Sequence, residues 1–314
     1  MDPDPRFRAL LQTFWLRPET ALWRAIDIRA MEGFRLEEPS LDLGCGDGLF
    51  SFLRAGGQLD PGRDAFESMG HMESYFKNVD AFDHLEAGFD LPVVREPAYR
   101  ITCGMDHKLN LLKKTEPLKL YREWVEGDAN QPLPFTDQRF QSVFCNILYW
   151  LDQPAAVLGE IHRILKWGGQ ACIFLPNPRF FEASFFLNHG GPGAAPEYGF
   201  LSLLDRGRME LIQQVHPTTR WEEFIQGAGF TIERRTDTLS LPVARIWDVG
   251  LRPLFPPLLR MSRAMDWASL APIKAEWVAI LMRFLEPMVR LDAVKCLEGQ
   301  GTFHCFWLAK ERCA

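Results

Sequence analysis

Residues 41–50 read LDLGCGDGLF and decide the fold of this 314-residue chain. The apolar run at its start is typical of a buried strand, and the apolar residues from Leu49 onward predict a helix. Between them stand three glycines at alternate positions, which permit a tight turn and let a ligand approach the backbone closely. The helix would direct free N–H groups at that ligand. The stretch therefore predicts a ligand-binding turn between a strand and a helix, with a turn that binds nothing as the alternative.

This stretch resembles motif I, D-x-G-x-G-x-G, of class I S-adenosylmethionine (SAM)-dependent methyltransferases. It differs from the G-x-G-x-x-G of dinucleotide-binding proteins, whose third glycine stands one residue later. The resemblance implies SAM as the cofactor. It also implies that Asp42 braces the loop and that Gly44, Cys45, Gly46 and Gly48 lie against the bound cofactor.

A second strand is predicted at residues 99–106, which end in Gly-Met-Asp as the family's second strand does. The resemblance implies that Asp106, with its neighbour His107, binds the SAM ribose. Asp106 follows Gly48 by 58 residues (106 − 48), whereas a minimal unit of this kind needs about 20.

The extra residues between Gly48 and Asp106 predict an insertion at residues 57–98, which carries several aromatic residues. Such a segment beside a ligand crevice could cover the substrate, or it could be a surface excursion or an oligomer contact. If the insertion boundary differs, Asp60 or Asp64 is the alternative ribose ligand.

The family pattern is dense over residues 99–176, with LPFTDQRF at 133–140 and EIHRILKWGG at 160–169. The resemblance implies that Asp128 and Ala129, after the third strand, bind the adenine. Asn146 ends the fourth strand and is expected at the crevice mouth, where ligands bind in open α/β sheets.

The expected fold is a Rossmann-like α/β sheet of seven strands. In the family the strand order is 3-2-1-4-5-7-6, with six parallel strands and strand 7 antiparallel. Residues 231–235 and 302–309 are the predicted sixth and seventh strands. Together with the helical insertions, which we expect to form a cap over the sheet, these elements make one elaborated methyltransferase domain.

The predicted organisation has three parts. Residues 1–38 form a helical segment that either covers the SAM pocket or packs on the sheet edge. Residues 39–235 and 302–314 form the core. Residues 236–301 form a helical cap rich in Trp, Met, Leu and Arg, with a membrane-surface element or a homodimer contact as the alternatives. The prolines in this last part predict that it is not one continuous helix.

The acceptor side offers three candidate catalytic residues. Tyr149 stands where the family often has Glu-His, so a histidine base is missing at that place. His189 lies in a glycine-rich loop and His216 precedes a helix start, and a histidine near neutrality suits a general base. Each of the three also has a purely structural interpretation.

The composition of the chain bears on its possible partners, metal sites and cellular location. The chain carries 35 Lys and Arg against 41 Asp and Glu, a formal charge of −6, which argues against nucleic acid as the partner. Its seven cysteines include no CxxC pair and no metal-ligand spacing, so no metal site is predicted. No apolar run has transmembrane length, and residues 1–5 lack a signal-peptide pattern, so we expect a cytoplasmic protein, with peripheral membrane contact left open.

The sequence thus predicts SAM-dependent methylation of a small or lipid-like molecule, with oxygen as the first choice of acceptor atom and carbon or nitrogen as alternatives. In-line methyl transfer asks the protein mainly to align the two reactants and exclude water, so the absence of an obvious catalytic motif is not an objection. The rival hypothesis is a non-catalytic SAM-binding scaffold or interaction protein, whose motif I would be equally intact.

Overall fold

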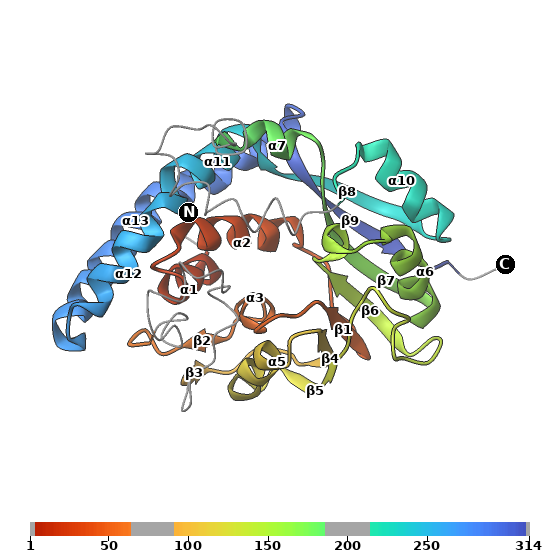
Figure 1. Ribbon diagram of the computed structural model, residues 1–314, viewed down its shortest axis with the longest axis horizontal. Helices are drawn as coiled ribbons and strands as arrows, with labels where there is room; N and C mark the ends of the chain where they lie inside the picture. Colours follow the sequence, from red (N-terminus) through yellow and green to blue (C-terminus); the bar gives the residue numbers. More distant parts are fainter. Residues whose placement is uncertain (1–3, 64–90, 186–213, 312–314) are drawn as a thin grey trace.

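The computed structural model describes residues 4–63, 91–185 and 214–311, and a seven-stranded mixed sheet forms its centre (Figure 1). The strand order is β5-β4-β1-β6-β7-β9-β8, and β9 runs antiparallel to both of its neighbours. In chain order this is 3-2-1-4-5-7-6, so the predicted fold class is confirmed. The strands are β1 (Ser40–Leu43), β4 (Ile101–Asp106), β5 (Tyr121–Glu126), β6 (Phe140–Cys145), β7 (Leu165–Pro176), β8 (Thr231–Ser240) and β9 (Gly301–Ala309).

The carboxyl ends of the central strands lie together at one edge of this sheet. Leu43, the last residue of β1, pairs with Met105 of β4 on one side and with Cys145 of β6 on the other. At the next position, Asp106 pairs with Glu126, the last residue of β5. The loops that leave these four strands therefore start from the same place, which is where an open α/β sheet binds its ligands.

Helices cover both faces of the sheet, which explains why β1 is buried along its whole length. In Figure 1, α1, α2 and α3 lie on one side and α6 and α10 on the other. Large side chains from both layers, such as Phe52 and Trp221, are completely buried. The helices of the core are α1 (Pro5–Thr13), α2 (Pro18–Ala30), α3 (Leu49–Arg54), α5 (Leu109–Thr115), α6 (Pro154–Ile164), α7 (Arg179–Ala183) and α10 (Thr218–Gly227), with the 3-10 turns η1 (Glu116–Leu118) and η2 (Leu148–Trp150).

The predicted insertion at residues 57–98 is described at its two ends. These ends form a small antiparallel pair, β2 (Gln58–Leu59) with β3 (Val93–Arg95). Residues 64–90, and with them Asp64, lie outside the described residues.

A helical segment follows β8, which itself runs on to Ser240. It consists of α11 (Leu241–Arg245), η4 (Ile246–Leu251), η5 (Arg252–Leu254), α12 (Phe255–Arg263) and α13 (Trp267–Leu297). The segment is broken into several helices, as its prolines predict. The proline rule is nevertheless wrong inside α13, which continues through both Pro272 and Pro287.

Helix α13 packs against the amino-terminal helices (Figure 1). The indole of Trp277 donates a hydrogen bond to the carbonyl of Trp15, with 3.1 Å between nitrogen and oxygen. The guanidinium of Arg29 donates to the carbonyl of Val289 at 2.7 Å, and it also pairs with the buried carboxylate of Asp292 at 3.0 Å. These contacts tie the far end of the chain to α1 and α2.

Candidate functional site

The loop between β1 and α3 has the backbone conformation that its glycines allow. Gly44, Gly46 and Gly48 have φ values of 78°, 57° and 73°, in the left-handed region that other residues rarely adopt. Gly44 also has no room for a side chain, because a Cβ there would lie 2.4 Å from Cγ2 of Ile147. The loop is therefore pressed against the residues that follow β6.

Gly46 faces the other way, into open space. A Cβ built on it would have no atom within 4 Å. Its N–H points instead at the end of β4, where it donates to Oδ2 of Asp106 at 2.9 Å. Open space therefore lies beside Gly46, and we call this space the glycine cradle. The two outer glycines, Gly44 and Gly48, are closely surrounded.

Asp106 lies at the centre of this edge and is 8% exposed. Its Oδ1 accepts a second backbone hydrogen bond, from Lys108 at 3.0 Å, and Nδ1 of the exposed His107 lies 3.5 Å from the same oxygen. A carboxylate offers about four lone-pair positions. The two backbone donors therefore orient Asp106 and leave part of its acceptor capacity for a ligand.

The predicted adenine residues lie next to Asp106. The N–H of Gly127 donates to the carbonyl of Asp106 at 3.0 Å, which fixes the start of the loop after β5. In that loop Asp128 is exposed, and its carboxylate accepts from the N–H of Asn130 at 2.9 Å, while Ala129 is buried. Asn146, half-buried, directly follows β6 at the same edge.

Asp42 is buried beneath the glycine loop. Its buried Oδ2 accepts hydrogen bonds from the hydroxyls of Ser51, at 2.5 Å, and Tyr121, at 2.7 Å. Burial raises the pKa of Asp42 above its ordinary value, and the two hydroxyl donors oppose that rise. Asp42 therefore braces β1 against α3 and β5, and Tyr121 is a partner that the sequence analysis did not find.

Cys45 is a packing residue of the loop. Burial, together with the nearby carboxylates of Asp42 and Asp106, raises the pKa of its thiol well above the ordinary value. The thiol is therefore protonated at neutral pH and unsuited to nucleophilic attack.

Of the three candidate catalytic residues, the structure describes Tyr149 and His216. Tyr149 is buried between the rings of Trp150 and Phe303, with ring centroids 5.3 and 5.6 Å away, and burial raises its pKa. Gln214 links Tyr149 to His216: its N–H donates to the carbonyl of Tyr149 at 3.0 Å, and its side chain contacts the ring of His216. His189 lies outside the described residues.

His216 is held by its own neighbours. Its Nε2 lies 2.8 Å from Oε1 of Gln214, and its ring packs edge-on against Trp221 and Phe224. Burial and the charge of Arg220 lower the pKa of His216, so the imidazole is neutral at pH 7. Neither Tyr149 nor His216 has a described contact with the glycine loop.

Helix α2 places a charged pair, Arg24 and Asp27, near the start of α3. No sequence motif predicts this pair. The guanidinium of Arg24 lies over the ring of Phe50 in α3, 5.0 Å from its centroid, and pairs with Oδ2 of Asp27 at 3.0 Å. Asp27 is completely buried, and its Oδ1 has no hydrogen-bond partner among the described residues. Burial raises its pKa to about 6. Only the spacing of Arg24 and Asp27, three residues apart in a helix with many apolar residues, could have suggested this pair.

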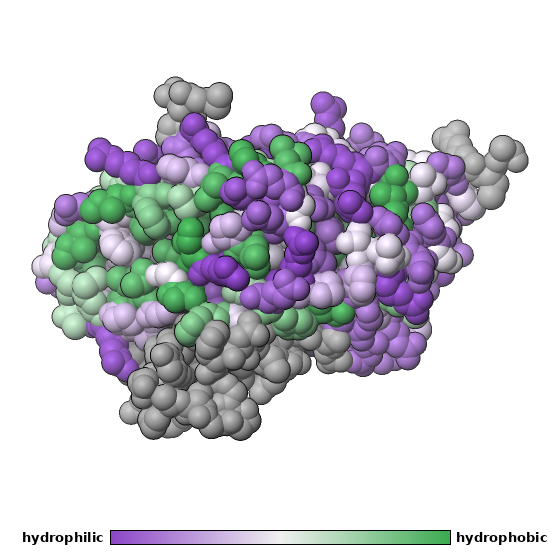
Figure 2. Space-filling model, turned by 90° about the horizontal axis from the view of Figure 1, so that it is seen from above, coloured by the Kyte–Doolittle hydropathy of each residue, from purple (hydrophilic) through white to green (hydrophobic). Residues whose placement is uncertain are grey.

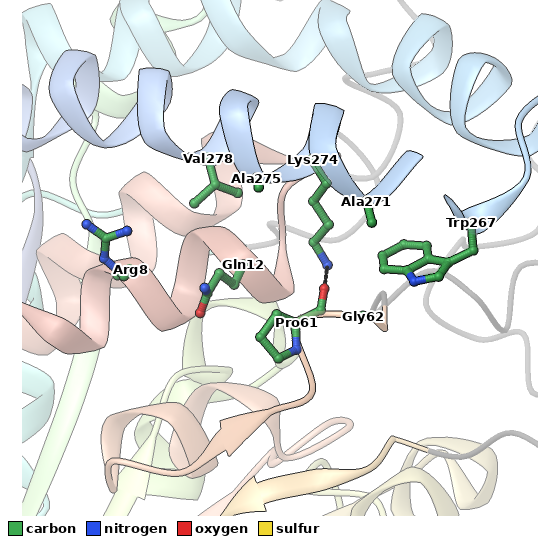
Figure 3. Close-up of a pocket in the computed structure, with 9 residues that line it drawn as sticks. All are labelled: Arg8, Gln12, Pro61, Gly62, Trp267, Ala271, Lys274, Ala275 and Val278. Atoms are coloured by element: carbon green, nitrogen blue, oxygen red, sulfur yellow. Dashed lines mark hydrogen bonds between the residues drawn. The ribbon is translucent and has the colours of Figure 1, made fainter. Parts of the chain in front are cut away.

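A cavity of about 380 Å³ lies away from the glycine loop, between α1, the turn after β2 and α13 (Figure 3). The ammonium of Lys274 closes one side by donating to the carbonyls of Pro61 and Arg63, both at 2.7 Å. Arg8, Gln12 and Trp267 complete its rim.

The described part of the chain contains no group of His, Cys, Asp and Glu side chains that could hold a metal ion. None of its helices is both long and apolar enough to cross a membrane.

Comparison with known proteins gives a family match inside this sheet. Residues 90–173 match the family described as "Methyltransferase domain". The chain is 43% identical over 83 residues to 2-methyl-6-phytyl-1,4-hydroquinone methyltransferase, chloroplastic, of Arabidopsis thaliana, which is 26% of this chain and 24% of that protein. It is 29% identical over 147 residues to the ubiquinone/menaquinone biosynthesis C-methyltransferase UbiE of Desulfotalea psychrophila, which is 43% of this chain and 57% of that protein.

The chain thus spans about a quarter of the length of the plant relative and little more than half of the bacterial one. Among solved structures it resembles an S-adenosylmethionine-dependent methyltransferase from Mesorhizobium loti, with 16% identity, a TM-score of 0.43, and coverage of 90% of this chain and 95% of that one.

The family match runs from the segment before β4 to the middle of β7, and so it contains Asp106 and the loops after β5 and β6. The glycine loop and the strand order, which were established independently of that match, are those of the same class. Residues 90–173 therefore match a methyltransferase domain, and the sheet that contains them has the strand order of Rossmann-like methyltransferase folds.

Proposed function

We propose that this chain transfers the methyl group of SAM to a small or lipid-like acceptor. The observation that carries the proposal is the pair formed by Gly46 and Asp106, in which an open glycine cradle lies against an oriented carboxylate. A cofactor with a ribose diol beside a charged amino-acid group needs these two features side by side.

The described residues fit such a cofactor. The free acceptor capacity of Asp106 suits the two ribose hydroxyls, and a Cβ would fill the space at Gly46 that the amino-acid part of SAM needs. Asp128 and Ala129 would hold the adenine, and Asn146 would lie at the crevice mouth. When bound, SAM supplies an electrophilic methyl group on a sulfonium, and the residues of this chain orient it and exclude water.

The proposed acceptor class is a phenolic quinol or a prenylated relative of one. Its support is the names of the two relatives: one is a hydroquinone methyltransferase, and the other is a C-methyltransferase of quinone biosynthesis. Oxygen stays the predicted receiving atom, and a ring carbon is the alternative that the second name suggests. O-methylation releases the phenolic proton and C-methylation releases the proton of the ring carbon, so both routes need a proton acceptor, for which Tyr149, His189 and His216 stay predictions.

The proposed division of the chain is unchanged: helical residues 1–38, the core at 39–235 and 302–314, and the cap at 236–301. In this arrangement α13 and the amino-terminal helices form one unit, because α13 bonds to Trp15 and Arg29.

The test is incubation of the protein with SAM carrying a labelled methyl group and a panel of quinols, followed by mass spectrometry of the product. We expect a labelled quinol, and its fragmentation distinguishes an O-methyl from a C-methyl group. Asp106→Ala, under the same conditions, is the matched control. Tight SAM binding without transfer to any quinol, or to any molecule of a cell extract, would support the scaffold hypothesis instead.

A further inference from the structure

Helix α13 carries an apolar face that the rest of the described chain leaves uncovered. Ile273, Ile280 and Phe284 recur at spacings of seven and four residues, which places them on one side of a helix. Ile280 and Phe284 are 51% and 50% exposed, and Ile273 is 38% exposed. We call these three residues the α13 apolar face. Exposed apolar side chains grouped in this way mark an interaction site more often than scattered ones do.

The space-filling view shows that the patch is larger than this face. Hydrophobic residues gather at the end of the molecule where α12 and α13 lie, with hydrophilic residues along their border (Figure 2). Met261 of α12 and Trp267, the first residue of α13, are also exposed. Tryptophan is favoured where an apolar surface meets water, because its ring is apolar and its N–H is polar.

Charge distinguishes this segment from the rest of the chain. Residues 241–297 carry eight Lys and Arg against five Asp and Glu, a formal charge of +3, whereas the whole chain carries −6. Arg245, Arg260, Arg263 and Arg283 are exposed.

The acidic residues on α13 are fewer and in part occupied. The side chain of Asp266 accepts from Ser269 at the start of the helix, and Glu286 bonds to Arg290 at 2.6 Å. Glu276 is exposed on the same side as the α13 apolar face. Among the exposed charged side chains of residues 241–297, arginines outnumber carboxylates.

We infer that the α13 apolar face rests on the surface of an anionic lipid membrane. Apolar side chains would enter the boundary between headgroups and acyl chains, and the arginines beside them would contact lipid phosphates, as in helices that lie in the membrane plane.

A second copy of the chain fits this surface less well. In a symmetric dimer the same surface meets itself, so the excess of exposed arginines on this segment would face the same excess on the partner. An anionic bilayer offers the opposite charge and has no such conflict. The inference concerns a surface separate from the SAM site, and vesicle binding is measured without SAM.

The test is flotation of the full chain with phosphatidylcholine vesicles that either contain or lack phosphatidylglycerol. We expect partition onto the anionic vesicles, weakened by salt, and little onto the neutral ones. The double change Ile280→Ser and Phe284→Ser should reduce partition at least tenfold, since it removes both large exposed side chains. Arg283→Glu should reduce it about tenfold.

Matched controls come from exposed residues elsewhere. Val94→Ser, at a residue 59% exposed on β3, and Lys113→Glu, on α5, should leave partition unchanged. Thermal melts verify that every variant folds. Absence of binding to anionic vesicles, or equal binding by all variants, would overturn the inference. So would a wild-type dimer in sedimentation velocity that the double change converts to a monomer while vesicle binding stays the same.

Discussion

The backbone N–H of Gly46 donates a hydrogen bond to the carboxylate of Asp106, with 2.9 Å between nitrogen and Oδ2. Asp106 is the last residue of β4, and Gly46 lies in the loop after β1, so the bond joins β4 to the middle of the glycine loop. One carboxylate thus shapes the loop and faces the space in which a cofactor would lie.

The first prediction concerns Asp106 itself. Asp106→Ala should weaken SAM binding by roughly tenfold to a hundredfold or more, because each charge-assisted hydrogen bond to a ribose hydroxyl contributes about 1.5–3 kcal/mol. Calorimetric titration of the purified variant with SAM gives the affinity. Asp137→Ala, at an exposed acid far along the chain, is the control. An unchanged affinity would move the ribose site to another acid, with Asp60 or Asp64 as the next candidates.

Gly44 and Gly46 should respond differently to substitution by alanine. Gly44→Ala should lower the free energy of unfolding by about 2–4 kcal/mol, because its Cβ would lie 2.4 Å from Ile147 at a positive φ. Gly46→Ala should cost only about 1 kcal/mol, since nothing lies within 4 Å of its Cβ, but it should reduce SAM affinity by filling the cradle. Urea unfolding and calorimetry on both variants separate the effects. Equal loss of stability in the two would contradict the observed loop.

Tyr121 should matter for stability more than its place at the start of a strand suggests. Tyr121→Phe removes a hydroxyl donor from the buried carboxylate of Asp42, which should cost about 1–3 kcal/mol of unfolding free energy. Tyr99→Phe is the control, because Tyr99 makes an exposed hydrogen bond with Arg54 and should cost less than about 1 kcal/mol. Urea unfolding measures both, and a Tyr121 effect no larger than that of Tyr99 would remove the bracing role of Asp42.

Asp27 gives a prediction with a definite pH dependence. Its pKa in the folded chain is raised from 3.8 to about 6, so the folded state holds a proton that the unfolded state has already lost between these values. Folding stability attributable to Asp27 therefore falls as pH rises from about 4 to about 6 and stays reduced above that range.

Asp27→Asn should accordingly stabilise the chain at pH 8 by about 1–3 kcal/mol and give no gain at pH 4. Unfolding by urea at the two pH values provides the comparison within one variant. A gain of the same size at both pH values would show that the effect comes from packing and not from the charge.

The sequence predicted the sheet and the glycine loop because both depend on local requirements. Gly44 and Gly48 need positive φ values, and β9 alternates and carries aromatic residues, so each pattern lies within a few neighbouring residues. The hydrogen bond between Tyr121 and Asp42 joins residues 79 apart, and the contact of Arg24 with Phe50 joins separate helices. Contacts of this kind leave no local pattern.

Helix α13 shows a case in which a local rule, that proline ends a helix, gives the wrong prediction. Proline removes an N–H donor and usually breaks a helix, yet Pro287 is exposed in the interior of α13. The carbonyl that loses its partner there is on the solvent side, where water can satisfy it. Whether a proline ends a helix therefore depends on which face it occupies, and this is set by the tertiary packing.

The position of β9 has a consequence for synthesis of the protein. This strand lies between β7 and β8, and among the described strands it is the only neighbour of β8 in the sheet. While the ribosome is still adding residues 301–309, β7 has an open edge and β8 has no place to dock. A nascent chain of this design must keep β7 and β8 from pairing with other chains until β9 has been synthesised, so its yield in cells should depend on chaperones that bind it before β9 emerges.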